Sequence, residues 1–215
     1  MRPTQGIAAF IVCALACASA SATVVATNTM YGVIDGNEAT RALDVGTHGT
    51  IRDLNIAVEF SKCDDPAIGP NGTTCKGTGV PFENEFDLVL IAPNGQRVML
   101  VESFDTYVAG TRGTGAGRVT VNFDDEAAAA AGPRVQGGSF RPEGMLSAFD
   151  GMDMFGSWTL YLQDFSPADP LEFFSARLDV SYDALPQPAP VPEPATLAML
   201  GLGLLGMRAA KRRSA

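Results

Sequence analysis

Five aspartates stand in stretches rich in turn-forming residues, where carboxylate oxygens can reach a metal ion. They are Asp124, Asp125, Asp150, Asp153 and Asp164. Calcium takes its oxygen ligands from loop carboxylates and carbonyl groups, so these residues are the candidate ligands of a calcium site. Glycosidases also use paired carboxylates as acid and base, but acidic residues in turns are usually solvated. The sequence therefore offers calcium as an optional cofactor and requires none.

The residue types needed for nucleophilic catalysis occur without the usual arrangement. The sole histidine, His48, lies in a Gly-Thr-His-Gly turn, and no Gly-x-Ser-x-Gly elbow is present. A lone histidine in a loop is far more often an exposed polar residue than a catalytic base. The glycine-rich stretch 113–117 lacks the strand-turn-helix context of a nucleotide-binding loop. We therefore expect no catalytic residues in this chain.

The first 22 residues have the pattern of a secretory signal peptide. They contain one basic residue, Arg2, an apolar stretch from Gly6 to about Ala18, and small residues before position 23. The apolar stretch is too short to span a bilayer. A lipoprotein signal through Cys17 is the alternative, although Ala14 stands where a large aliphatic residue is expected. The pattern predicts export of the domain that follows.

The last residues form a second targeting pattern. Residues 195–207 carry no charge, and at about 1.5 Å per residue they would cover roughly 20 Å of a hydrocarbon core about 30 Å thick. A permanent membrane anchor of this length would be strained. The basic residues that follow are Arg208, Lys211, Arg212 and Arg213. Basic residues beside a membrane segment stay on the cytoplasmic side, which again predicts export of the middle of the chain.

The residues just before this apolar run carry a resemblance to a known signal. Val191, Pro192, Glu193 and Pro194, the short apolar run and the basic end resemble the PEP-CTERM sorting signal of Gram-negative bacteria. The resemblance implies that an exosortase, a membrane-bound cysteine peptidase, recognises and removes the tail. It also implies transient residence in the inner membrane, then delivery to the cell surface or the exopolysaccharide matrix. An ordinary tail anchor after a proline-rich linker is the alternative.

Export favours a disulfide in the mature domain. Cys13 and Cys17 fall within the predicted signal peptide, which leaves Cys63 and Cys75 on either side of a turn-rich stretch. Two cysteines allow one intramolecular pairing, and closing a loop of this size contributes on the order of 3 kcal/mol in the chain-entropy model. Zinc would need further ligands, and His48 is not at zinc-motif spacing. We expect a disulfide rather than free thiols.

Composition and charge exclude nucleic acid as a partner. The 215 residues are 46% hydrophobic and 18% charged, with a formal net charge of −9. Residues 23–191 contain 10 basic and 23 acidic residues, which gives this part a charge of −13. A nucleic-acid interface needs a basic face. The length suits one globular domain.

Strands must position the candidate residues, because the middle of the chain alternates apolar and polar residues with a period of two. Such segments, separated by turn residues, predict an all-β fold, an antiparallel β-sandwich. They lie near 53–60, 86–91, 98–101, 119–123, 158–163 and 174–182. One short helix is expected near 125–131, where acidic residues precede an alanine run. The expected segments are a signal peptide at 1–22, the sandwich at 23–183, a Pro/Ala-rich linker at 184–191 and the sorting segment at 192–215.

Several segments of the sandwich region resemble the P domain, or Homo B domain, of subtilisin-like proprotein convertases. They are residues 87–95, 123–127, 138–143, 146–151, 156–164 and 178–182, in the order of that family. The resemblance implies a β-sandwich of jelly-roll type, similar to galactose-binding-like domains. In convertases this domain supports the folding and stability of the neighbouring protease domain. Residues 59–85 depart from the family pattern by a cysteine-bearing insertion, and the last strand matches it only loosely.

Two classes of function follow from these resemblances. The first is a non-catalytic surface or exopolysaccharide-matrix protein, whose sandwich binds polysaccharide or a surface protein after exosortase sorting. The second is an accessory domain of a subtilisin-like serine endopeptidase. The tail favours the first class and the sandwich favours the second. Tyr161 is expected on the opposite face of its strand from Trp158, where its ring would be available to a glycan.

Overall fold

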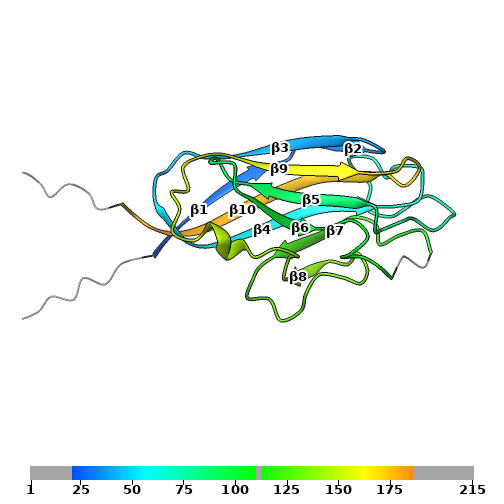
Figure 1. Cartoon of the computed structure of the whole chain (residues 1–215). Helices are drawn as coiled ribbons and strands as arrows, with labels where there is room; N and C mark the ends of the chain where they lie inside the picture. The colour runs from blue at the N-terminus through cyan, green and yellow to red at the C-terminus, as the bar shows by residue number, and fades with distance from the viewer. Residues whose placement is uncertain (1–20, 110–112, 186–215) are drawn as a thin grey trace, which may run out of the picture. The chain divides into compact units, whose positions relative to one another are not determined.

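The computed structural model describes residues 21–109 and 113–185, and it confirms the all-β class. Within these residues, ten strands and one short 3₁₀ helix make up the fold (Figure 1). The elements are β1 Ser21–Asn28, β2 Gly32–Ile34, β3 Glu38–Val45, β4 Thr50–Lys62, β5 Phe86–Ile91, β6 Arg97–Val101, β7 Val119–Phe123, β8 Gly138–Phe140, η1 Leu146–Phe149, β9 Gly156–Asp164 and β10 Leu171–Asp183.

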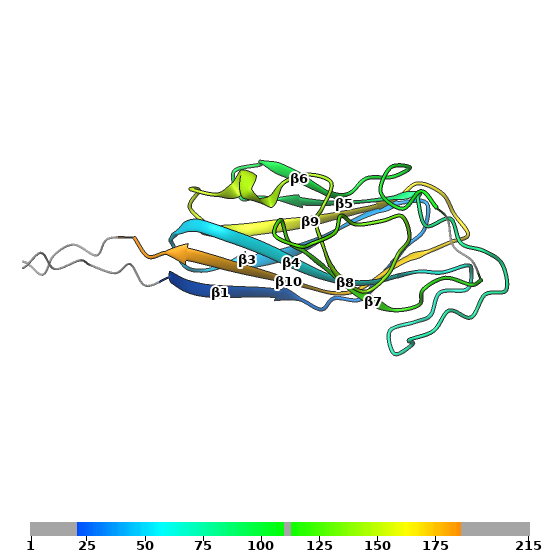
Figure 2. The ribbon, with the colours of Figure 1, turned by 90° about the horizontal axis from the view of Figure 1, so that it is seen from below.

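The strands form two sheets that pack face to face as a sandwich (Figure 2). Sheet A has the order β1-β10-β4-β7-β8, with β2 also paired to β10, and sheet B has the order β3-β9-β5-β6. The pairing of β7 with β8 is parallel, whereas the other strand pairs are antiparallel. Without the short β2 and β8, the main strands divide between the sheets in the order of a jelly roll. The expected jelly-roll type is therefore confirmed.

The core lies between the two sheets and is built from the inward positions of the strands. Alternate residues point to opposite faces of a strand, so an apolar residue at every second position forms one wall of a core. The wall formed by β4 is Leu54, Ile56, Val58 and Phe60, and that formed by β9 is Trp158, Leu160 and Leu162. These are the alternating positions that the sequence predicts. Trp158 is fully buried, and its indole N–H donates to the carbonyl of Met154 at 3.0 Å.

The expected helix near 125–131 does not form, so this part of the prediction is wrong. Residues 125–131 make a turn and then an irregular extended segment. The Ala131 amide donates to the Arg141 carbonyl at 2.9 Å, and the Arg141 amide donates to the Ala129 carbonyl at 2.8 Å. Backbone groups engaged in this pairing are not available for the i to i−4 bonds of a helix. A helix this short is marginal on its own, and the tertiary pairing prevails.

The one helical turn of the described residues lies further along the chain, at Leu146–Phe149. Leu146 and Phe149 are buried, and the ring of Phe149 meets Trp158 edge-on with ring centres 5.0 Å apart. The carboxylate of Asp125 accepts the backbone amides of Leu146 at 2.9 Å and Ser147 at 2.8 Å. Asp125 thus satisfies the first free amides of a helical turn rather than beginning a helix of its own.

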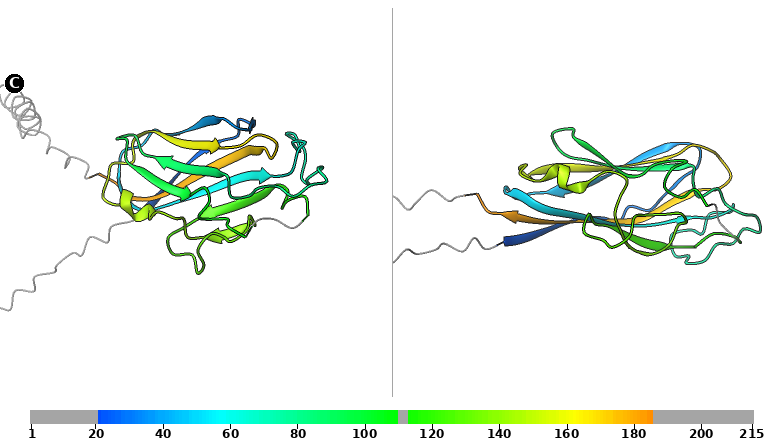
Figure 3. Two further views of the ribbon diagram at one scale, coloured as in Figure 1. Left: turned by 45° about the vertical axis from the view of Figure 1, so that its right-hand side comes forward. Right: turned by 60° about the horizontal axis from the view of Figure 1, so that its bottom comes forward.

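The two described ends of the domain lie at the same end of the sandwich, where Ser21 pairs with Asp183. The connections at the opposite end include three that we call the distal loops: residues 63–85, residues 102–109 with 113–118, and residues 165–170 (Figure 3). The described residues contain no helix that is long and apolar enough to span a bilayer. The predicted apolar tail at 195–207 lies outside the described residues.

Candidate functional site

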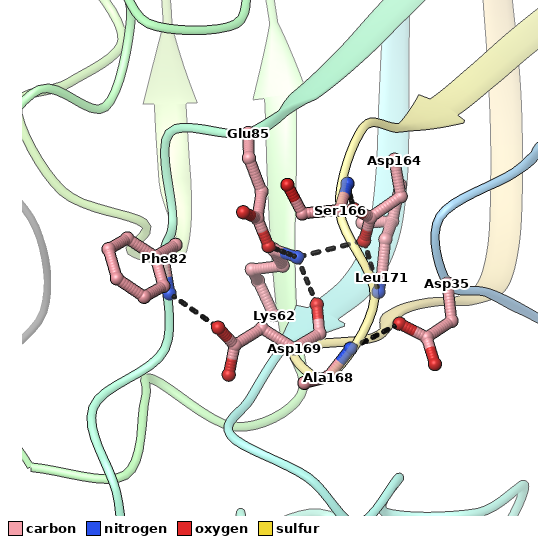
Figure 4. A network of polar contacts seen from close by, with 9 residues as sticks. All are labelled: Asp35, Lys62, Phe82, Glu85, Asp164, Ser166, Ala168, Asp169 and Leu171. Carbon is pink, nitrogen blue, oxygen red and sulfur yellow. Dashed lines mark hydrogen bonds and ion pairs between the residues drawn. The ribbon is translucent and has the colours of Figure 1, made fainter.

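A buried group of ionisable side chains lies at the base of the distal loops. We call it the Lys62 cluster: Lys62, Glu85, Asp164 and Asp169 (Figure 4). The Nζ atom of Lys62 lies 2.8 Å from Glu85 Oε1 and 2.8 Å from Asp164 Oδ2, and it also donates to the backbone carbonyl of Asp169. The side chains of Lys62 and Asp164 have no exposed surface, and Glu85 keeps 7% exposure. Buried charges of this kind need partners, and here they find them in one another.

Strands from both sheets position the cluster. Lys62 is the last residue of β4 in sheet A, and Asp164 is the last residue of β9 in sheet B. Glu85 directly precedes β5, and Asp169 lies just before β10. Lys62 and Asp164 are 102 residues apart in sequence, so only the packing of the two sheets brings them together.

Backbone amides fix the acidic members of the cluster and the loops that carry them. The carboxylate of Asp164 accepts the amide of Ser166 at Oδ1, 3.2 Å away, and the amide of Leu171 at Oδ2, 3.1 Å away. The carboxylate of Asp169 accepts the amide of Phe82 at 3.2 Å. These bonds tie the loop before β10 to the end of β9 and to the loop before β5 (Figure 4).

The cluster carries more negative than positive charge. Burial raises the pKa of the Asp164 and Glu85 carboxyl groups, although the Lys62 ammonium acts in the opposite direction. Two carboxyl groups share one ammonium, so one negative charge would remain unbalanced if both were ionised. A buried carboxyl group without a counter-charge keeps its proton more readily. Glu85 and Asp164 are therefore suited to hold one proton between them.

Lys62 and Glu85 belong to the cluster, but the sequence motifs do not single them out. A signal for Lys62 was present, because it continues the inward positions of β4 after Phe60. Asp164 likewise continues the inward positions of β9 after Leu162. Charged residues at core positions of two strands predict a buried ion pair. Glu85 offers no such signal, because it precedes its strand.

The predicted disulfide is present between Cys63 and Cys75, whose Cα atoms are 5.5 Å apart. It closes the first part of the distal loop 63–85, directly beside Lys62. The side chain of Ile68 within this closed loop is buried. Lys76 donates to the Ile68 carbonyl at 2.7 Å. The cysteine-bearing insertion is thus a folded part of the domain.

The five aspartates proposed as calcium ligands are divided among different environments. Asp164 contacts Lys62, and Asp153 accepts the amide of Gly49 at 3.1 Å and contacts His48. Asp124 accepts the Glu126 amide at 2.8 Å. Residues 21–109 and 113–185 include no group of three or more histidine, cysteine or acidic side chains arranged to hold a metal ion. Calcium binding remains a prediction.

Part of this acidic set does lie close together, near the described ends of the domain. Burial and the charges of Asp53 and Asp125 raise the pKa of Asp150. A hydrogen bond with Asp124, burial and the charge of Asp53 raise the pKa of Glu126. Mutual repulsion among carboxylates therefore disfavours their ionised forms.

The single histidine takes part in a surface contact between two turns. His48 Nδ1 lies 2.7 Å from Asp153 Oδ2, and its ring stacks on Phe155 with centres 4.0 Å apart. The His48 side chain is 56% exposed. Among the described residues, its hydrogen-bond partner is a carboxylate and not the hydroxyl that a serine nucleophile would supply.

The outer face of sheet B presents an aromatic ring surrounded by polar groups, centred on Tyr161. The phenol oxygen lies 2.5 Å from Glu38 Oε2 and 2.9 Å from Gln163 Oε1. The Arg97 guanidinium lies 5.8 Å from the centre of the ring. The hydrogen bond to Glu38 and burial raise the pKa of Tyr161. As the sequence predicts, Tyr161 lies outside the core that Trp158 joins.

The distal loops expose three phenylalanines that the sequence analysis did not identify. Phe82, Phe104 and Phe165 are 64%, 61% and 44% exposed. The Phe104 amide donates to the Asn84 carbonyl at 2.6 Å and the Phe165 amide donates to the adjacent Glu85 carbonyl at 2.9 Å, so these residues flank the same segment. Phe104 has a φ of 66°, a left-handed conformation that is unfavourable for a bulky residue. Exposed aromatic residues of this kind are typical of interaction surfaces.

Comparison with protein families identifies the C-terminal signal. Residues 190–213 match the PEP-CTERM protein-sorting motif. The predicted residues Val191, Pro192, Glu193 and Pro194 and the basic residues up to Arg213 fall within this match, outside the described residues. The match supports an exported protein that an exosortase processes and that reaches the cell surface.

Comparison with other proteins adds similarity of the fold. The search of curated proteins found no match. The serine protease of Aeromonas sobria is similar at 14% identity and a TM-score of 0.46, over 76% of this chain and 27% of the protease. The structure of its complex with the chaperone ORF2 is similar at 13% identity and a TM-score of 0.45, over 77% of this chain and 28% of the matched chain. This chain thus spans little more than a quarter of those proteins.

The crystal structure of FLHE is a third similar structure, with 9% identity and a TM-score of 0.38, over 76% of this chain and 97% of FLHE. At these values none of the three structural similarities assigns a function. The family match likewise concerns the tail alone, and the P-domain resemblance of the sandwich stays a prediction.

Proposed function

We propose that the protein is a non-catalytic binding module of the bacterial cell surface or exopolysaccharide matrix. The sorting motif at residues 190–213 is the observation that carries this proposal. It follows a jelly-roll domain whose described ends lie together, at the end opposite the distal loops. A domain held through its C-terminal side would present its distal loops and its outer faces to the surroundings.

Polysaccharide is the first candidate ligand, and the surface around Tyr161 is its candidate site. Sugar rings stack on aromatic rings, and their hydroxyl groups bond to carboxylates, amides and guanidinium groups. Glu38, Gln163 and Arg97 supply these groups within a short distance of the Tyr161 ring. Tyr161 lies on a strand that is hydrogen-bonded on both sides, so little conformational freedom would be lost on binding.

A protein partner is the second candidate, favoured by the exposed Phe82, Phe104 and Phe165. Aromatic residues dominate the energetically important part of protein interfaces. The sequence resemblance to P domains suggests a subtilisin-like serine endopeptidase as one such partner. In that case the chain would serve as a separate accessory domain. No proteolytic activity of its own is proposed, in keeping with the lack of a Ser-His-Asp arrangement in the sequence.

The predicted removal of the tail is tested by measuring the intact mass of the reduced protein from its native host. Exosortase processing predicts a chain that begins near residue 21 or 23 and ends near residues 192–194. A mass that retains residues 195–215 would refute the sorting model and indicate a membrane anchor. The same measurement in a strain without exosortase is the control, because the unprocessed tail should then remain.

The two candidate ligands are separated by full-length variants expressed in the native host. Tyr161→Ala should reduce retention in the polysaccharide matrix and leave any co-purifying protein unchanged. Phe104→Ser should have the reverse effect. Normal matrix retention of Tyr161→Ala would exclude the surface around Tyr161 as the glycan site. Recovery of a subtilisin-like protease with the wild type but not with Phe104→Ser would support the accessory role.

A further inference from the structure

We propose that Lys62 and Asp164 form an intramolecular isopeptide bond, with Glu85 as the catalytic residue that moves the protons. The juxtaposition of an amine, a carboxyl group and a second carboxyl group inside a sandwich carries this proposal. It concerns the finished covalent structure of the domain and does not depend on which ligand the domain binds.

The reacting groups are already in contact. Lys62 Nζ lies 2.8 Å from Asp164 Oδ2, which places the nitrogen next to the carboxyl carbon that it would attack. Glu85 Oε1 lies 2.8 Å from the same nitrogen, so it can accept a proton directly. Groups held at such distances react as if at very high concentration, because the entropy of bringing them together has been lost on folding.

The surroundings favour the protonated form of the carboxyl groups in the cluster. The side chains of Lys62 and Asp164 have no exposed surface. Burial destabilises a carboxylate relative to a carboxylic acid. The raised pKa values of Asp164 and Glu85 have this cause. A neutral amine is the nucleophile that amide formation requires.

The reaction balances without any co-reactant. With Asp164 protonated, the Lys62 ammonium gives one proton to the Glu85 carboxylate, and the free amine attacks Asp164 Cγ. A C–N bond forms, and the carbonyl electron pair moves onto oxygen. Glu85 returns its proton to the departing hydroxyl group, the C–O bond breaks and water leaves. The carbonyl forms again, and Glu85 takes the remaining proton from nitrogen. The products are a secondary amide, one water and a protonated Glu85.

Hydrogen-bond donors stand where negative charge develops during the attack. The Leu171 amide points to Asp164 Oδ2 at 3.1 Å and the Ser166 amide points to Oδ1 at 3.2 Å. Fixed amides of this type stabilise a tetrahedral oxyanion. The Asp169 carbonyl accepts a hydrogen bond from Lys62 Nζ and so orients the amine. The same loop segment, 166–171, supplies these contacts.

The bond would join the two sheets covalently. Lys62 ends β4 of sheet A, and Asp164 ends β9 of sheet B. The adjacent Cys63 already forms a disulfide. Together the two cross-links would fasten the distal end of the sandwich, which suits a domain exposed to proteases and mechanical load outside the cell.

The test is the mass of the reduced wild-type protein, followed by peptide mapping. We expect a mass about 18 Da lower than the mass calculated for the reduced, processed chain. The difference is the water that is released when the amine is acylated. Trypsin should yield residues 53–76 joined to residues 135–177, because modified Lys62 is not cleaved and Arg141 precedes a proline. A full mass with separate peptides 53–62 and 135–177 would overturn the proposal.

Variants separate this bond from other losses of water. Lys62→Met and Glu85→Gln should each restore the full mass. Lys76→Met is the matched control and should leave the mass loss unchanged, because its ammonium donates to the Ile68 carbonyl outside the cluster. A persistent mass loss in Lys62→Met would show a dehydration elsewhere, such as at Asp150 before Gly151, and would refute the assignment. The wild-type peptide map decides the question even if a variant fails to fold. Tail processing is read from a different part of the chain, so either proposal can fail alone.

Discussion

The carboxylate of Glu172 accepts the backbone amide of Ile68 at 2.6 Å, beneath the loop that the Cys63–Cys75 disulfide closes. Glu172 has no exposed surface. Its other hydrogen-bond donors are the Gly69 amide at 2.8 Å, the Ser61 hydroxyl at 3.0 Å and the Tyr31 hydroxyl at 2.6 Å. The closed loop is therefore held both by a covalent bond and by a buried carboxylate.

Glu172→Gln should loosen this loop. An amide nitrogen cannot accept the two donors that one carboxylate oxygen receives, so we expect the free energy of unfolding to fall by about 1–3 kcal/mol. Urea unfolding measures this loss, and amide hydrogen exchange at Ile68 and Gly69 should become faster. Glu126→Gln, at an exposed position, is the matched control. Unchanged exchange at both amides would contradict the assigned role of Glu172.

The double variant Cys63→Ala, Cys75→Ala should lose about 2–4 kcal/mol of stability, as is usual for a structural disulfide. The amides of Ile68 and Gly69 should nevertheless stay protected in the folded state, because Glu172 still accepts them. Combining this variant with Glu172→Gln should remove the protection. If the double variant alone exposes the loop, the disulfide is its principal restraint.

The pair Glu59 and Arg118 should make stability depend on acidic pH. Arg118 contacts both carboxylate oxygens at 2.8 Å and lies over the ring of Phe174. The hydrogen bond from Arg118 lowers the pKa of Glu59 below its ordinary value of 4.5. The stabilisation is therefore present above that value and is lost as the pH falls through the lower pKa of the folded state.

Glu59→Gln tests this dependence. At neutral pH the variant should be less stable than the wild type by about 0.5–1 kcal/mol, because the ion pair is partly exposed. The difference should shrink below about pH 4 as Glu59 takes up a proton in both states. Denaturant titrations at several pH values measure it. A difference that stays constant with pH would attribute the loss to packing instead.

Asp150→Asn should stabilise the domain at neutral pH. Burial and the charges of Asp53 and Asp125 raise the pKa of Asp150, so its ionised form is disfavoured in the folded state. The stabilising contribution of this raised pKa is present in acid and is lost as the pH rises through it. Removing the charge should add a few tenths of a kcal/mol, a small effect because Asp150 is only partly covered and water screens much of the interaction. Thermal unfolding at pH 7 and pH 3.5 checks this, with a gain expected only at pH 7.

The same variant examines the calcium prediction. If calcium binds among these aspartates, it should raise the melting temperature of the wild type and lose this effect in Asp150→Asn. The matched control is Asp179→Asn, which lies outside the candidate set and whose carboxylate contacts Arg177. An equal calcium effect in wild type and Asp150→Asn would place any calcium binding elsewhere.

The strands could be predicted because each depends on local information. Alternation of apolar and polar residues has the period of a strand, and burying one face of each strand gives a sandwich. The same alternation places Tyr161 and Trp158 on opposite faces of their strand, as observed. The expected helix near 125–131 does not form, because an alanine run reflects only the local helix propensity. The backbone groups of Ala129 and Ala131 instead pair with those of Arg141, a contact that no local sequence pattern predicts.

The sequence by itself determined the strand pattern, the acidic charge, the cysteine pair and the sorting signal, because each depends on composition or on residues close together in the chain. The tertiary structure alone decided which distant side chains meet. Lys62 and Asp164 come from different sheets and are separated by 102 residues. Glu172 meets Ile68 across 104 residues. Such contacts arise when two sheets and their loops pack at a fixed register, and that register is a property of the whole chain.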